Sequence, residues 1–278
     1  MKTTYKGGGW LRTGIKEILW RCLKGRDGLT GVRVISGPSR GTRIRVDFRS
    51  ESSYWLGTYD RKILSLLMQI IKPGQIAYDC GAYIGIYTAT MRRAVGLNGR
   101  VYAFEASSLN YQRIARLPEA NGWRNLQVEY LAIGEAHTTI RFASNLGAAS
   151  GPIDMPGKNF PLESVQIENV PCSGVDELIF ERGFPAPDFL KFDLETGEGF
   201  ALLNGSRLWK EKRPTVLVEL HKNSEPTPFA FESAEQFLRD FDYYGTEVHL
   251  GCPVKSVDDF VGAEKLGVQC TILAVPKN

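Results

Sequence analysis

Short apolar segments alternate with helix-period segments through most of this chain. The apolar segments are four to eight residues long and bounded by turn residues, which predicts buried strands. They are QIAYDC (75–80), GRVYAFEA (99–106), LQVEYLAIG (126–134), PDFLKFDLE (187–195) and RPTVLVELH (213–221). Amphipathic segments between them, including one from about Leu109 to Asn121, predict helices. Strands that alternate with helices indicate an α/β fold with a doubly wound, mostly parallel sheet. The last strand candidates, TEVHLG and VQCTILAVP, lie close enough in sequence to form an antiparallel edge.

The first 50 residues follow a different pattern. Residues 10–25 place apolar side chains at near-helical spacing with basic residues between them, which predicts an amphipathic helix. GVRVISG and TRIRVDF alternate apolar and polar residues on either side of GPSRG, a hairpin pattern. We therefore divide the chain into a helix and β-hairpin appendage, residues 1–50, and a main α/β domain, residues 51–278.

Charge is distributed unevenly between these two parts. Residues 1–50 carry 12 Lys/Arg and 3 Asp/Glu, whereas the remainder carries 22 and 28. A basic arm on an acidic body can meet an anionic partner, although a solvated basic face is the commoner arrangement. Nucleic acid is therefore not the expected partner. The apolar stripe of residues 10–25 predicts packing on the main domain or on a twin subunit, so a homodimer is one alternative.

The sequence contains no membrane-spanning signal and no disulfide pattern. No apolar run reaches the roughly 18 residues that a membrane span needs. The N-terminus lacks the apolar region of a secretory signal. The five scattered cysteines predict free thiols in a reducing compartment. We therefore expect a cytoplasmic protein without a membrane span.

The segment DCGAYIG follows the first strand of the main domain and is the first candidate for chemistry. Gly81 permits a tight turn, and Gly85 permits close approach of the next helix. Ligands of open α/β sheets bind beyond the carboxyl ends of the strands, where this turn lies. Asp79 precedes the turn, and its carboxylate repels a pyrophosphate but attracts a cationic group.

A second acid completes a pattern for a nucleoside ligand. Glu105 ends the second strand, 26 residues after Asp79, where an acid can accept hydrogen bonds from both ribose hydroxyls. S-adenosylmethionine has a ribose, an ammonium and a sulfonium, and no phosphate, so it suits both acids. Ala132, near the end of the third strand, is then expected beside the adenine ring. Taken singly, Asp79 is equally consistent with a helix N-cap and Glu105 with an exposed strand end.

A nicotinamide dinucleotide is the alternative ligand, because it also carries ribose. The dinucleotide fingerprint GxGxxG is not met, since Tyr83 stands where the middle glycine belongs. The acid at the turn also disfavours a pyrophosphate. A Rossmann-type oxidoreductase therefore remains as the enzyme alternative.

These segments together resemble a known family. LGTYDRKILSLLMQIIKPGQIAYDCGAYIGIYTA, VYAFEA, LAIG, FLKFDLETGE and VLVELH are similar, in this order, to the FkbM-type S-adenosylmethionine-dependent methyltransferases. The similarity runs from about Arg40 to His221. It implies a class I methyltransferase fold, which is Rossmann-like, with residues 51–278 as the methyltransferase domain. It also implies O-methylation of a hydroxyl on a carbohydrate or another small metabolite.

The family resemblance extends to particular residues. Asp79, Gly81, Gly85 and Glu105 match the family pattern. Tyr83 stands where Asn is usual, and DLETGEGFALLNG replaces the commoner Asp-x-Glu-Gly run. The candidate cofactor-binding residues are Tyr59, Asp79, Gly81, Ala82, Tyr83, Gly85, Glu105, Ala106, Ala132 and Asp193. Tyr59 is included because an aromatic ring before the cofactor strand can stack on adenine or on a sugar, although core packing explains it equally well.

Catalytic candidates lie at the ends of the fourth and fifth strands. Asp193 and Glu195 end one, Glu219 and His221 end the other, and residues two apart on a strand share a face. His221 is the candidate general base, with Glu219 holding its tautomer and Asp193 orienting the cofactor ammonium or the substrate. Alternatively, Asp193, Glu195 and Glu219 hold a divalent metal ion that polarises the substrate hydroxyl. A structural hydrogen bond between Glu219 and His221, in a scaffold without catalysis, is the third possibility.

Overall fold

The computed structural model describes residues 17, 21–25, 27–146, 150–153, 165–221, 229–266 and 270–277. The amphipathic helix predicted at 10–25, and the homodimer contact predicted for it, lie largely outside the described residues. Within the described part, no helix combines the length and the apolar character that crossing a membrane requires.

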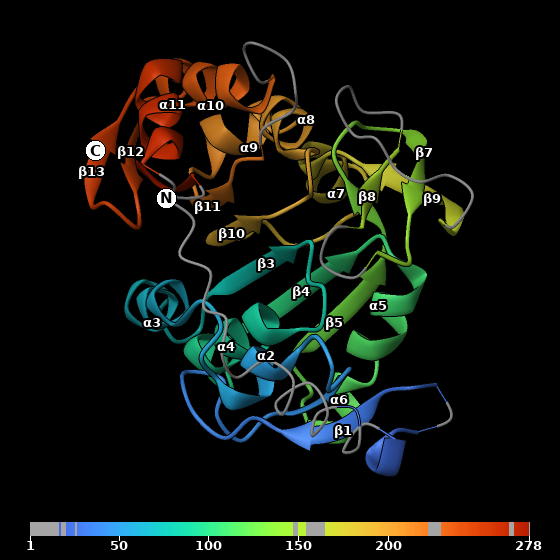
Figure 1. Ribbon diagram of the computed structural model, residues 1–278. Coiled ribbons are helices and arrows are strands. Elements are labelled where there is room, and N and C mark those ends of the chain that lie inside the picture. The colour runs from blue at the N-terminus through green and yellow to red at the C-terminus, as the bar shows by residue number, and fades with distance from the viewer. Residues whose placement is uncertain are drawn as a thin grey trace.

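A large sheet of eight strands organises the molecule, in the order β13-β12-β14-β11-β10-β3-β4-β5 (Figure 1). Its strands are β3 (Ile76–Cys80), β4 (Arg100–Glu105), β5 (Leu126–Tyr130), β10 (Phe189–Phe192), β11 (Thr215–Glu219), β12 (Tyr243–Glu247), β13 (Cys252–Val254) and β14 (Thr271–Pro276). Strands β5, β4, β3, β10 and β11 run parallel to one another, and β14 runs antiparallel to both β11 and β12. The predicted mostly parallel sheet with an antiparallel edge region is confirmed.

Helices cover both faces of this sheet. Figure 1 shows α3 and α4 on one side and α8 to α11 on the other. The helices are α2 (Ser52–Leu56), α3 (Arg61–Ile70), α4 (Ile86–Val95), α5 (Ser108–Ile114), α6 (Leu117–Asn121), α7 (Val175–Phe180), α8 (Glu198–Leu203), α9 (Ser206–Glu211), α10 (Phe229–Asp240) and α11 (Val257–Lys265). Successive strand residues point to opposite faces, so Tyr78 joins the core that contains Trp209, while Ala77 joins the core that contains Met91. The central strands β3, β4, β10 and β11 are therefore buried on both sides.

A second, smaller sheet covers the carboxyl ends of β4 and β5. It consists of β6 (Ala132–Ile133), β7 (Thr138–Ala143), β8 (Gly151–Pro152) and β9 (Ile167–Ser173), in the order β6-β9-β7-β8. The segment LQVEYLAIG was predicted as one strand and is divided between the two sheets. Strand β5 stops pairing with β4 after Tyr130, and Ala132 then pairs with Cys172 of β9.

The predicted N-terminal hairpin is present as β1 (Thr30–Arg33) and β2 (Arg43–Val46), which pair antiparallel. Ile44 and Val46 are buried in the same core cluster as residues of α3 and α4. The hairpin is therefore packed directly on the main sheet's helices, and a domain division at residue 50 stays a prediction.

The order of the strands places a ligand crevice at one point of the sheet. From β3 the chain proceeds outward to β4 and β5, and it then returns to the other side of β3 with β10. The loops that follow β3 and β10 therefore diverge, which leaves a crevice at the carboxyl ends of these two strands.

Candidate active site

A cavity of about 550 Å³ opens at this crevice. Its size is within the range of about 300–1,000 Å³ that is usual for small-molecule sites. Ten of the residues proposed from the sequence line it: Tyr59, Gly81, Ala82, Tyr83, Glu105, Ala106, Ala132, Asp193, Glu195 and Glu219. Asp79, Gly85 and His221 are not among the described lining residues.

The turn after β3 is shaped by two glycines with different roles. Gly81 has φ +81°, and a Cβ there would lie 1.9 Å from the carbonyl oxygen of Asp193. Only glycine permits this approach of the turn to the end of β10. Gly85 has φ +86°, and a Cβ there would lie 2.3 Å from Leu117. Gly85 therefore allows α4 to pack on α6, and it does not itself face the cavity.

Asp79 lies beneath the cavity and not in its wall. Its side chain is fully buried, accepts a hydrogen bond from Thr88 at 2.6 Å, and lies 3.3 Å from the ammonium of Lys191. Burial raises the pKa of Asp79, while Lys191 opposes that shift. The carboxylate therefore meets a cation of the protein itself, and a direct contact with a cationic cofactor stays a prediction.

Lys191 connects Asp79 to the cavity. Its ammonium lies 3.3 Å from Asp79 and 3.3 Å from Asp193, and it donates to the carbonyl of Gly81 at 3.0 Å. Burial lowers the pKa of Lys191, but Asp193 and Asp79 outweigh this effect and raise it above the ordinary value. Lys191 is therefore a buried cation that fixes the turn after β3 against the end of β10.

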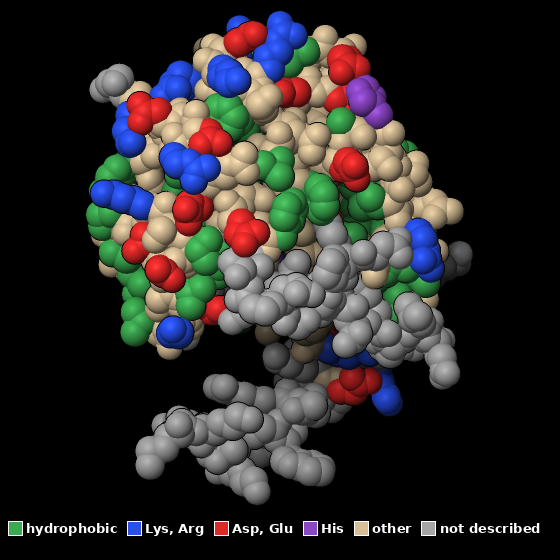
Figure 2. Space-filling model, turned by 90° about the horizontal axis from the view of Figure 1, so that it is seen from above, with side chains coloured by type: hydrophobic (Ala, Val, Ile, Leu, Met, Phe, Trp, Pro, Cys, Tyr) green, Lys and Arg blue, Asp and Glu red, His purple; other side chains and the backbone are tan. Residues whose placement is uncertain are grey.

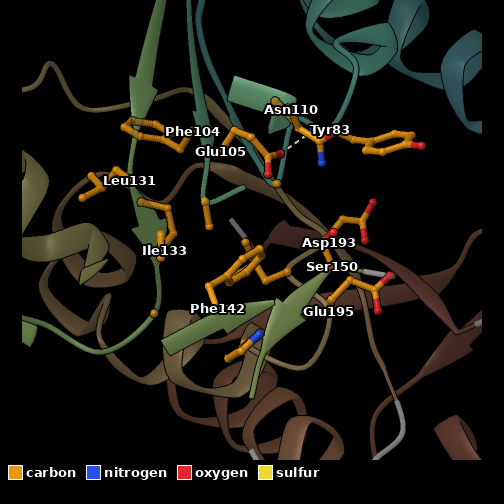
Figure 3. Close-up of a pocket in the computed structure, with 18 of the residues that line it drawn as sticks. Tyr83, Phe104, Glu105, Asn110, Leu131, Ile133, Phe142, Ser150, Asp193 and Glu195 are labelled. Atoms are coloured by element: carbon orange, nitrogen blue, oxygen red, sulfur yellow. Dashed lines mark hydrogen bonds between the residues drawn. The ribbon is translucent and has the colours of Figure 1, made fainter. Parts of the chain in front are cut away.

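Glu105 ends β4 at the cavity, as predicted (Figure 3). Its two carboxylate oxygens accept from the backbone amides of Tyr83 at 2.7 Å and Ser107 at 2.8 Å. Burial raises the pKa of Glu105 to about 7, although these two hydrogen bonds act in the opposite direction. The fixed, buried carboxylate suits the ribose hydroxyls of a nucleoside, because each of its oxygens can still accept another hydrogen bond.

The cavity has an apolar end and an acidic end. Figure 3 shows Phe104, Leu131 and Ile133 on one side and Asp193 and Glu195 on the other. Phe142, from β7 of the small sheet, and Ala132 also line the cavity. An apolar slot next to a carboxylate that can accept hydrogen bonds from ribose suits an adenosine group, so the residues present fit the adenosyl part of S-adenosylmethionine.

The acidic end gathers the catalytic candidates. Nε2 of His221 lies 3.8 Å from Asp193, 3.6 Å from Glu195 and 3.7 Å from Glu219. Nδ1 of His221 lies 2.8 Å from the fully buried Glu198. The sequence interpretation gave Glu219 the role of holding the His221 tautomer, and in the structure Glu198 occupies that position.

The charges of this cluster are strongly coupled. Burial lowers the pKa of His221, but Glu198, Asp193 and Glu195 outweigh it and raise the value to about 10. Burial and the charge of Asp193 raise the pKa of Glu219 to about 8. A general base needs an unprotonated nitrogen at working pH, which the surrounding carboxylates oppose, and the base role of His221 stays a prediction.

The loop after β10 holds the acidic end in an unusual backbone conformation. Glu195 has φ +52° and Thr196 has φ +93°, which is a strained value for a β-branched residue. Thr196 directly follows Asp193-Leu194-Glu195, where the family commonly has glycine. The loop therefore has a backbone conformation that glycine favours, although a threonine occupies the position.

Tyrosines from α2, from the turn between α2 and α3, and from the β3 turn form a further wall. Tyr54 and Tyr59 stack with ring centroids 4.2 Å apart, and both line the cavity. The hydroxyl of Tyr83 donates to Glu51 at 2.6 Å, and Glu51 also accepts from Arg113 at 3.0 Å. The segment before α2 is thereby connected to the cofactor turn through Tyr83.

Two residues of this site were not singled out in the sequence, Lys191 and Glu198. Lys191 could have been identified from the sequence, because a charged residue inside the apolar run FLKF is unusual. It also shares a strand face with Asp193. Glu198 had none, because its contact with His221 depends on the path of the loop between β10 and α8.

Several solved structures align with this chain at low identity. A crystal structure of an FkbM methyltransferase from Methylobacillus flagellatus aligns with TM-score 0.44 and 17% identity, over 94% of this chain and 58% of that one. Aeropyrum pernix fibrillarin with natively bound S-adenosylmethionine aligns with TM-score 0.46 and 13% identity, over 90% of each chain. An S-adenosylmethionine-dependent O-methyltransferase from Thermotoga maritima aligns with TM-score 0.42 and 13% identity, over 78% of this chain and 65% of that one.

These alignments carry no argument about activity, because their identities and TM-scores are low. The present chain spans little more than half the length of the Methylobacillus protein. No curated protein matches the sequence. The family model described as the methyltransferase FkbM domain matches residues 79–244, which is more than half of the chain. The chain therefore belongs to the FkbM family of S-adenosylmethionine-dependent methyltransferases.

Proposed function

We propose that the protein is an O-methyltransferase that moves a methyl group from S-adenosylmethionine to a hydroxyl of a carbohydrate or another small metabolite. The cofactor supplies an electrophilic methyl group. The acceptor oxygen must be aligned with it and must lose its proton. The observation that carries the proposal is the acidic end of the cavity, where Asp193 and Glu219 reach the wall beside the β3 turn.

Carboxylates favour a hydroxyl acceptor for a physical reason. An ionised carboxylate only accepts hydrogen bonds, so Asp193 and Glu195 would bind and align the O–H groups of a polyhydroxylated molecule. The stacked Tyr54 and Tyr59 offer an aromatic face in the same cavity, and such a face suits the C–H surface of a sugar ring. A carbohydrate hydroxyl satisfies both features at once.

Membership of a methyltransferase family argues against the oxidoreductase alternative. On the face in Figure 2, Lys and Arg side chains are interspersed with Asp and Glu, so this face does not favour a nucleic-acid substrate. Single-sign basic surface is the usual footprint of a nucleic-acid site. All five cysteines are free thiols, which supports the proposed cytoplasmic location.

The test is a methyl-transfer assay with the purified chain and labelled S-adenosylmethionine. Sugars, glycosides and hydroxylated metabolites are each offered beside the analogue that lacks the hydroxyl, and methylated products are identified by mass spectrometry. We expect transfer to at least one hydroxyl compound and none to its deoxy analogue. Transfer confined to amines or thiols would contradict the proposal.

Variants relate the activity to the acidic end. Glu219→Gln is expected to lower kcat by about 100-fold or more, with the Kd for S-adenosylmethionine within about threefold of the wild-type value. Glu135→Gln is the matched control, because Glu135 lines the same cavity outside the acidic cluster. Calorimetry with S-adenosylmethionine addresses the scaffold alternative, since a scaffold without catalysis should bind it weakly or not at all.

A further inference from the structure

Side chains from two neighbouring strand ends bring three metal-ligand atoms to one point. Asp193 follows β10, and Glu219 and His221 lie at and beyond the end of β11. One oxygen or nitrogen atom from each lies within 4.8 Å of the other two. The distances from His221 Nε2 are 3.8 Å to Asp193 and 3.7 Å to Glu219. These are longer than hydrogen bonds. They are close to the roughly 3–4 Å that separate ligands bound to one ion at about 2.1 Å.

The orientation of the imidazole is fixed in the manner of a metal ligand. Histidines that bind metals almost always donate their other ring N–H to a carboxylate, a backbone carbonyl or a water molecule. Here Nδ1 of His221 lies 2.8 Å from Glu198, which is fully buried. Glu198 is itself held by the amides of Leu194 at 2.8 Å and Thr196 at 3.4 Å. This contact turns Nε2 toward the carboxylates of Asp193 and Glu219, and it is independent of their own positions.

Asp193 is arranged so that its two oxygens serve different purposes. Oδ2 lies 3.3 Å from the ammonium of Lys191, whereas Oδ1 faces His221. Glu195 brings a further carboxylate within 3.6 Å of the same nitrogen. The cluster thus collects several negative groups around one imidazole in a partly buried place, which a bound cation would balance.

We propose that Asp193, Glu219 and His221 bind a hard divalent cation, Mn²⁺ or Mg²⁺, at the acidic end of the cavity. Carboxylate oxygens suit Mg²⁺ and Mn²⁺, and a single imidazole among oxygen ligands is compatible with Mn²⁺ in particular. The three donors leave coordination positions open toward the cavity, because Asp193 and Glu219 both line it.

The catalytic role of this cation rests on the proposed function, to which it adds a way of activating the acceptor hydroxyl. A substrate hydroxyl that occupies an open position on the ion becomes more acidic. Its proton can then pass to the carboxylate of Glu195, which lies beside the cluster and lines the cavity. In this arrangement His221 is a ligand, and Glu195 is the group that accepts the proton.

Metal binding is tested without any turnover. The full chain is stripped with a chelator, and binding of Mn²⁺ alone is followed by electron paramagnetic resonance, with Mg²⁺ as the competitor. We expect one Mn²⁺ per chain, displaced by excess Mg²⁺. Asp193→Asn and Glu219→Gln should each weaken Mn²⁺ binding by at least tenfold, and Glu198→Gln by about 10- to 100-fold through the imidazole.

Controls separate a lost site from a lost fold. Glu135→Gln removes a cavity carboxylate outside the cluster and should bind Mn²⁺ like the wild-type protein. Thermal melting and S-adenosylmethionine affinity are measured for each variant. A variant that neither melts cooperatively nor binds the cofactor is replaced by His221→Gln. Unchanged Mn²⁺ affinity in folded Asp193 and Glu219 variants overturns the inference, as does absence of binding at millimolar Mn²⁺. Methyl transfer that persists in the chelator-treated protein would contradict the proposed role of the cation and would still agree with the proposed O-methyltransferase function.

Discussion

Thr196 offers a direct measurement of the strain stored beside the acidic end. Its φ of +93° is a region that glycine adopts freely and a β-branched residue does not. Holding a residue other than glycine there costs about 1–3 kcal/mol. Its hydroxyl is buried without a hydrogen-bond partner among the described residues, which costs about 1–3 kcal/mol more.

Replacing Thr196 with glycine removes both costs and introduces two smaller ones. The more flexible unfolded chain opposes folding by about 0.4–1 kcal/mol. Loss of the buried methyl group removes about 0.8 kcal/mol of apolar burial. We therefore expect Thr196→Gly to raise the free energy of unfolding by about 2–3 kcal/mol. For 278 residues, this corresponds to a melting temperature higher by about 3–5 °C.

Thermal melting and urea unfolding of matched variants provide the assay. Thr196→Ala removes the hydroxyl but keeps a Cβ at the strained φ, so the difference between the alanine and glycine variants isolates the backbone strain. Thr246→Gly, in the middle of β12, should instead lower stability by about 1 kcal/mol, because glycine weakens a regular strand. A Thr196→Gly protein that melts at or below the wild-type temperature would refute this account of the loop.

Two further predictions concern the cofactor end. Gly81→Ala should cost about 3 kcal/mol or more and abolish S-adenosylmethionine binding in calorimetry, because its Cβ would meet the Asp193 carbonyl at 1.9 Å. Gly74→Ala, with φ +89° and open space around the Cβ, should cost only about 1–2 kcal/mol and leave binding unchanged. The raised pKa of Glu105, about 7, means that folding binds a proton there, so its stabilising contribution is present below the ordinary pKa of 4.5 and is lost as pH rises through 7. The ionised form accepts ribose hydroxyls, so cofactor affinity should rise between pH 6 and 8 in the wild-type protein, and a pH profile identical to that of Glu105→Gln would contradict this.

The fold could be predicted from the sequence where the apolar pattern alone determines the element. The strands around Tyr78, Ala103 and Val218 are uninterrupted apolar runs, which a sheet buried on both faces requires. The helix predicted from Leu109 to Asn121 is divided into α5 and α6, with Pro118 at the start of the second. The division of LQVEYLAIG between two sheets was not predictable, because periodicity does not specify the strand with which a segment pairs.

The site was predictable as far as parallel strands determine it. Their carboxyl ends meet at one edge, so Glu105, Asp193 and Glu219 were expected together, and all three line the cavity. The direction in which each side chain points could not be predicted from the sequence. Asp79 points to Lys191 beneath the cavity, and Glu198 reaches His221 only because the strained loop after β10 brings α8 close.

The register between β3 and β10 explains why a cationic nucleoside suits this crevice. Lys191 stands directly opposite Asp79 across the two parallel strands, and Asp193 lies two residues further on the same face. One buried ammonium therefore lies between two carboxylates, at 3.3 Å from each. Two carboxylates therefore share one ammonium beside the acidic end of the cavity. We expect this excess of carboxylates to favour a ligand with an ammonium and a sulfonium over one with a pyrophosphate at the turn. The same sheet topology serves both ligand classes, so the carboxylate that Asp193 adds beside the Lys191–Asp79 pair is the feature that would distinguish them.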